Sequence, residues 1–230
     1  MPLRLSLAAM ALLALAVAAF WPGYLSKFAT AGRYTHVHAA LGTGWLLLLV
    51  AQPLLIRASL RSWHRRLGRI GVLAGAAFFV SGILFAHRSV ARMDADEFAR
   101  EGRFVYLPLA MAAIFAGALV LAVVWRRTPA LHGRFMAATA LPLLDPLFAR
   151  LLFRYAPPLP DESLYQVPAF ALSTAILSAL YASLPATTQG RPTFAYFALG
   201  ATAIFAGYFV VPYTSAWQAF ATWFRALPLT

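Results

Sequence analysis

Long apolar stretches alternate with short polar loops along most of this chain. A membrane-spanning helix needs about 20 predominantly apolar residues, and a stretch of this length with few charges is typical of one. We therefore expect an all-α fold, a polytopic membrane helix bundle that passes several times through the inner (cytoplasmic) membrane of a bacterium. The pattern predicts about seven transmembrane helices, over residues 3–21, 36–56, 67–87, 104–125, 131–153, 166–184 and 193–212.

The chain is expected to form a single membrane domain over residues 1–230. Four of the predicted helices, within residues 36–153, would form a core four-helix unit. The helices over 3–21, 166–184 and 193–212 would then lie at its periphery.

The first apolar stretch has two interpretations. Its end, Ala16-Val17-Ala18-Ala19, resembles the cleavage site of a secretory signal. The stretch over 3–21 is also long enough to span a membrane, and for that reason we expect it to remain as a helix.

The tail over residues 213–230 is rich in aromatic residues. Trp217, Phe220 and Phe224 would share one face of a helix, because they are three and four positions apart. Aromatic rings gather at the level of the lipid headgroups. The tail therefore predicts a short C-terminal interfacial helix.

Composition excludes a soluble fold. Hydrophobic residues make up 62% of the chain and charged residues 11%, against about 45–50% and about 25% in soluble domains. The net charge of +12 comes from arginines in short loops, which favours contact with lipid headgroups and not with nucleic acid. The chain has no cysteine, which excludes disulfides, thiolate metal sites and cysteine nucleophiles.

The orientation follows from the basic loops. The segment Trp63-His64-Arg65-Arg66-Leu67-Gly68-Arg69 precedes an uncharged apolar stretch, and the loop over 126–134 is also basic. Short loops rich in arginine stay in the cytoplasm. We therefore predict a cytoplasmic N-terminus and an external C-terminus.

This topology sorts the five histidines into two layers. His36, His38 and His87 fall at the outer ends of the second and third helices, and His64 and His132 at inner ends. The 23 positions from His64 to His87 correspond to roughly 34 Å of helix. Two such layers suit two b-type haems, each held by axial histidines from two helices. The outer pair would be His38 and His87, and the inner pair His64 and His132. The alternative is that these histidines are interfacial residues that bind loops or headgroups.

The outer layer also suits a metal ion. His36, His38 and His87 precede a segment that holds Asp94, Asp96 and Glu97, and histidine with carboxylate is a ligand set for zinc, iron or copper. In the alternative interpretation, residues 92–103 form a solvated helix of mixed charge.

Several polar side chains fall inside the predicted spans. They are Gln52, Arg134, Asp145 and Arg150. An intramembrane carboxylate indicates a functional site by default, and Pro142 and Pro146 would bend the helix around Asp145. A partner for Asp145 would have to come from another helix. The alternative is a purely structural carboxylate.

Small and hydroxyl residues predict helix packing. Gly71 and Gly75 form a small-xxx-small contact face, and Ser173, Thr174 and Thr202 on the last two helices are interpreted as packing residues.

Two motifs resemble a family of bacterial membrane proteins that carry a domain of unknown function. The first is the histidine-arginine-x-leucine-glycine-arginine segment that begins at His64, and the second is Leu131-His132-Gly133-Arg134-Phe135-Met136, with Arg150 near the end of that helix. The resemblance covers about residues 36–153. Gly133 and Phe135 stand where the family commonly has larger basic and tryptophan residues. The family implies no reaction, although its histidine placement is similar to that of four-helix b-type cytochromes.

Three functions remain open at this stage. The first is a redox protein that uses a haem or another histidine-bound metal for electron transport, with a quinone or other membrane subunits as partners. The second is a small-solute or proton transporter that uses Asp145. The third is a non-catalytic accessory or sensor subunit. The sequence does not decide whether the protein is an enzyme, since it contains no nucleophile elbow, phosphate loop or His-Glu-x-x-His motif.

Overall fold

The computed structural model describes residues 2–159, 162–185, 187–189 and 191–230, and its regular elements are all helical. The α-helices are α1 (Pro2–Phe20), α2 (Arg33–Arg57), α3 (Arg61–Ala91), α4 (Ala95–Glu101), α5 (Tyr106–Val124), α6 (Pro129–Ala138), α7 (Leu141–Tyr155), α8 (Gln166–Ala182), α9 (Pro192–Tyr208) and α10 (Ser215–Ala226). Short 3₁₀ helices are η1 (Leu25–Thr30), η2 (Gly102–Val105), η3 (Glu162–Tyr165) and η4 (Val211–Tyr213).

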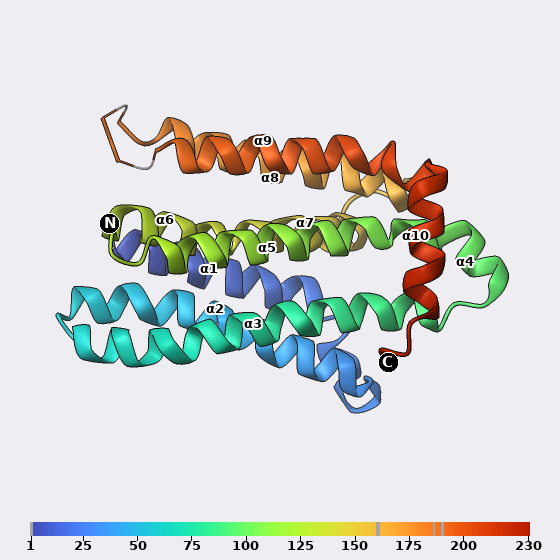
Figure 1. Ribbon diagram of the computed structural model, residues 1–230, viewed down its shortest axis with the longest axis horizontal. Helices are drawn as coiled ribbons and strands as arrows, with labels where there is room; N and C mark the ends of the chain where they lie inside the picture. Colours follow the sequence, from blue (N-terminus) through green and yellow to red (C-terminus); the bar gives the residue numbers. More distant parts are fainter. Residues whose placement is uncertain (1, 160–161, 186, 190) are drawn as a thin grey trace.

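The long helices run side by side, with the N-terminus at one end and α4 and α10 at the other (Figure 1). α2 packs against α1 and α3, and α5 packs against both α3 and α6. α8 and α9 form a layer along one side, where they contact α7, α6 and α5. The chain is therefore a helical membrane bundle, as its apolar stretches predict.

Six helical segments of the described chain are long and apolar enough to cross a membrane, so the predicted number of seven is not confirmed. They are Leu3–Phe20, Arg33–Arg57, Arg61–Ala91, Ala95–Val124, Pro129–Tyr155 and Pro192–Tyr213. The segment expected over 166–184 is the 17-residue helix α8, which is apolar but shorter.

A buried tryptophan of α2 contacts both α3 and the segment that joins α6 to α7. Trp45 of α2 is 1% exposed, and its Nε1 donates to Thr139 Oγ1 at 3.1 Å. Its ring fills the space above Gly75 of α3, where an added Cβ would lie 2.8 Å from Trp45 Cζ3 and 2.7 Å from Leu119 Cδ2. The predicted small-residue contact face of α3 is confirmed at Gly75, since only glycine leaves room there for the tryptophan.

The segment predicted as one helix over 131–153 is broken into α6 and α7. The break falls at Thr139 and Ala140, just before Pro142 at the start of α7. Proline has no N–H to continue the hydrogen-bond ladder of α6. The Thr139 hydroxyl donates to Met136 O at 2.6 Å and accepts the Trp45 N–H, which satisfies polar groups at the break.

The predicted C-terminal helix, α10, lies across the end of the bundle opposite the N-terminus and nearly perpendicular to it (Figure 1). Its aromatic face packs against protein: Phe224 is 4% exposed, and Trp217 Nε1 donates to Arg103 O at 2.7 Å. α10 therefore covers the ends of α3 and η2, and Trp223 is the aromatic residue that it leaves exposed.

Candidate functional site

The structure brings the inner pair of histidines together. His64 lies in the first turn of α3 and His132 in the first turn of α6, and their ring centroids are 6.3 Å apart with the ring planes at 85°. α5 packs against both α3 and α6. The two histidine rings therefore meet at one end of the bundle. Of the two predicted histidine pairs, this one has the geometry of a shared site.

Hydrogen bonds define the orientation of these rings. His132 Nδ1 lies 2.9 Å from Ala122 O, and because a carbonyl only accepts, Nδ1 is the donor and Nε2 is the ring nitrogen left for a ligand. His64 Nδ1 is buried without a hydrogen-bond partner among the described residues, as is Gln52 Oε1. Both atoms are therefore buried polar groups at this end of the bundle that make no hydrogen bond within the described chain.

The surroundings of the pair are basic. Arg65 follows His64 directly, and the Arg66 guanidinium lies 5.6 Å from the centroid of the Trp63 ring. Arg134, two residues after His132, is 3% exposed; its Nη1 donates to Ala130 O at 2.9 Å. Arg134 Nε is buried without a partner in the described part of the chain. A ligand that carries negative groups would suit this environment.

The outer pair is not brought together. His38 Nδ1 lies 3.0 Å from Ser81 Oγ, and its ring stacks between Phe78 and Phe85 at centroid distances of 4.9 and 5.3 Å. Since the Ser81 hydroxyl donates to Phe78 O, His38 is the donor in the bond to Ser81. These contacts occupy one face of α3.

His87 lies on the opposite face of α3, because at 3.6 residues per turn it is about half a turn away from Phe78 and Phe85 around the helix axis. It is 1% exposed beneath α10, where its ring meets Phe224 edge to face at 5.2 Å. Its Nδ1 lies 2.8 Å from Thr230 Oγ1. One iron between His38 and His87 is incompatible with this arrangement.

The predicted metal set at the outer end is also dispersed. His36 Nδ1 lies 3.0 Å from Tyr24 Oη, and its ring meets Phe28 at 4.5 Å. In the part of the chain that the structure describes, no three histidine or carboxylate side chains come close enough to hold one metal ion. His36, His38 and His87 are thus in three separate environments.

The acidic segment is solvated. Asp96 and Glu97 are exposed on α4, and Asp94 is exposed just before it, where its Oδ1 caps the helix by accepting from Glu97 N at 2.8 Å. These observations agree with the alternative interpretation, in which residues 92–103 form a solvated helix of mixed charge.

Asp145 is the buried carboxylate of α7, and its partner comes from another helix. It is 2% exposed, and Gln166 Nε2 at the start of α8 donates to both carboxylate oxygens at 3.1 Å. Arg150 is exposed and lies near enough to interact electrostatically with both Asp145 and His38, while its Nη1 donates to Pro146 O in its own helix. Gln166 was missed by the sequence analysis. The sequence feature that could have identified Gln166 is its position as a single amide side chain at the start of an apolar stretch.

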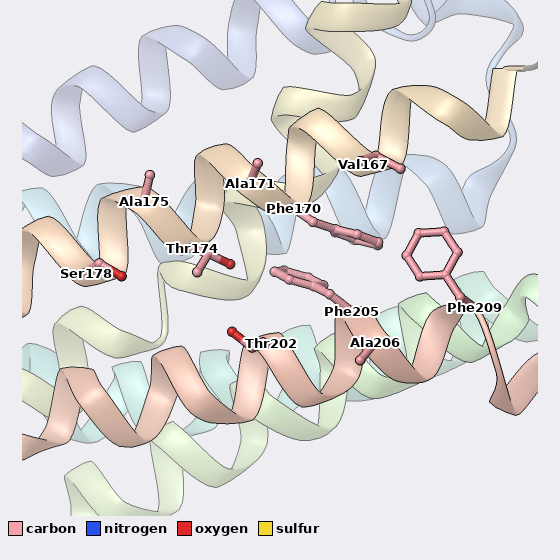
Figure 2. Close-up of a pocket in the computed structure, with 10 residues that line it drawn as sticks. All are labelled: Val167, Phe170, Ala171, Thr174, Ala175, Ser178, Thr202, Phe205, Ala206 and Phe209. Carbon is pink, nitrogen blue, oxygen red and sulfur yellow. The ribbon is translucent and has the colours of Figure 1, made fainter.

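Two cavities border α8, at a distance in the chain from the histidines. One is an open groove of about 510 Å³ between α8 and α9 (Figure 2). The other, of about 10 Å³, is enclosed by α5, α7, α8 and α9 and is bordered by Ser173, whose hydroxyl is buried without a partner among the described residues. The sequence analysis assigned these hydroxyl-bearing helices to packing alone.

Comparisons with known proteins gave no family model, no curated protein and no solved structure that matches this chain. The resemblance over residues 36–153 therefore stays a prediction.

Proposed function

We propose that this chain is a membrane redox protein in which His64 and His132 hold the iron of one b-type haem at the end of the bundle predicted to be cytoplasmic. One observation carries the proposal: two histidines 68 positions apart in the sequence approach to 6.3 Å between ring centroids, from helices that do not adjoin in the chain. Cofactor sites in helix bundles are built in this way, from side chains on facing helices.

The separation of the rings suits a shared iron. The rings are close enough for one metal ion to reach a nitrogen of each, because metal–imidazole bonds are about 2 Å long. The His132 N–H bond to Ala122 O is the kind of outer contact that fixes the tautomer of a ligating imidazole. Neither cavity described above lies beside these rings, so the proposal stands on the ring pair and its partners.

The number of ligands favours haem over a bare ion. A protein zinc site needs three or four side-chain ligands, and no third candidate joins the pair among the described residues. Haem iron needs only axial ligands from the protein. Arg65, Arg66 and Arg134 would offer charge to the carboxylates of the haem. When bound, the haem supplies one-electron transfer, and the chain holds and orients it.

The remaining expectations belong to the same proposal. A bacterial inner membrane would be the location, and a lipid-soluble quinone or another membrane subunit would be the electron partner. The metal set of His36, His38 and His87 and the outer haem pair are not part of it.

Absorption spectra of the purified protein, oxidised and then reduced with dithionite, test the proposal. We expect a Soret band and b-type α-bands that are lost in His64→Ala and in His132→Ala. His38→Ala and His36→Ala are matched controls at the other end of the bundle and should keep the spectrum. A colourless protein from haem-sufficient cells, or a spectrum lost only in the controls, would overturn the proposal.

A second candidate is proton or solute transport through Asp145. The observation in its favour is a nearly fully buried carboxylate whose hydrogen-bond partner is the neutral amide of Gln166. Such groups mark proton relays and substrate paths in membranes. In proteoliposomes with an internal pH dye, Asp145→Asn should abolish proton flux while Asp94→Asn, on exposed α4, preserves it. Absence of flux in the unmodified protein would remove this candidate.

A further inference from the structure

The groove between α8 and α9 is built as an open binding surface. It has a volume of about 510 Å³, which falls within the usual range of about 300–1,000 Å³ for small-molecule sites. Ala171, Ala175 and Ser178 of α8 and Thr202 of α9 are exposed along it. Figure 2 shows Ser178, Thr174 and Thr202 toward one end and the phenylalanine rings toward the other.

Aromatic rings line one end of the groove. Phe170 and Phe205 are stacked, with centroids 3.9 Å apart and planes at 15°. Phe209 stands edge-on to Phe170 at 6.3 Å and is 53% exposed. Phe170 and Phe205 are 5% and 7% exposed, so a flat ring in the groove would contact chiefly the exposed Phe209, in the offset-stacked or edge-to-face arrangement that aromatic groups favour.

Hydroxyl groups lie beside these rings. Thr174 and Thr202 project into the groove from opposite helices (Figure 2). Neither hydroxyl has a hydrogen-bond partner in the described part of the chain. Within a bilayer, lipid tails offer hydroxyls no partner, and a polar group without one is costly. An occupant with hydrogen-bond acceptors suits the groove better than an acyl chain does.

We propose that the α8–α9 groove binds a quinone-type molecule, with its flat ring chiefly against Phe209 and a carbonyl oxygen accepting from Thr174 and Thr202. The apolar tail would follow Ala171 and Ala175 along the groove. The role of this molecule as an electron partner rests on the proposed function, whereas its binding does not require the haem.

A fluorescence titration tests the inference. Because the chain has no cysteine, Ser183→Cys just beyond α8 provides a single labelling site outside the groove. Decylubiquinone, which quenches the label, should bind saturably to the labelled protein in detergent. Decane, which has a tail but no carbonyl, should not displace it.

Paired variants identify the groups that bind. Thr174→Val with Thr202→Val removes both hydroxyls at constant shape and should weaken quinone affinity about tenfold. Thr222→Val, on the exposed side of α10, should leave it unchanged. His64→Ala should also bind normally, which separates this inference from the haem proposal. Quenching that does not saturate, displacement by decane, or full affinity in the valine pair would overturn the inference.

Discussion

At the scale of single residues, the contact of Trp45 with Gly75 sets how closely α2 and α3 approach. Gly75→Ala would place a methyl group 2.7–2.8 Å from Leu119 and Trp45. Overpacking of this kind typically costs about 1–3 kcal/mol, so we expect a lower midpoint of thermal unfolding in detergent. Gly44→Ala is the matched control, because nothing lies within 4 Å of its added Cβ. Equal stability of the two variants would contradict this packing.

The Asp145–Gln166 contact gives a second residue-level prediction. Gln166→Leu removes the amide that satisfies a buried carboxylate and should destabilise the protein clearly, because a buried polar group is left unpaired. Adding Asp145→Leu should recover much of the lost stability. Thermal unfolding of the two single variants and the double variant measures the coupling. Additive losses would show that the two side chains do not interact.

Residue types alone could predict that Asp145 needs a partner from another helix, and that His64 and His132 share a layer. They could not identify Gln166, because pairing across helices depends on how α7 and α8 pack and on the break before Pro142. They also could not separate His38 from His87. The sequence correctly places His87 near the end of α3 that lies opposite His64, but the two sides of that helix are distinguished only by the neighbours that cover them.

At the scale of elements, α10 is a cap whose two faces behave differently. Phe224 is 4% exposed and Trp223 is 56% exposed. Phe224→Ala should cost about 3–5 kcal/mol and lower the unfolding temperature, whereas Trp223→Ala should change it little. A larger effect from Trp223 would mean that α10 turns its other face to the bundle.

The sequence pattern predicts the elements well where apolar periodicity decides them. The aromatic spacing of the tail correctly indicated a short helix. It could not show that the aromatic face packs against α3 and η2, because lipid and protein attract the same apolar face. The break between α6 and α7 was only partly foreseen, since Thr139 and Trp45 meet through tertiary packing.

At the scale of the whole molecule, the orientation in the membrane stays a prediction with a direct test. Arg61→Cys, next to the inner basic loop, and Arg100→Cys, on α4, are exposed and lie at opposite ends of the bundle. In intact cells, a membrane-impermeant maleimide should label the cysteine at position 100 and spare the one at position 61. The reverse pattern would place the His64–His132 end outside.

The central claim is that one histidine pair, and only that pair, holds a cofactor. The most direct measurement is the haem content per chain of the purified unmodified protein and of His64→Ala, taken with the reduced spectrum of each. The account predicts one b-type haem per unmodified chain and none in His64→Ala. Two haems per chain, no haem, or full occupancy in His64→Ala would contradict it.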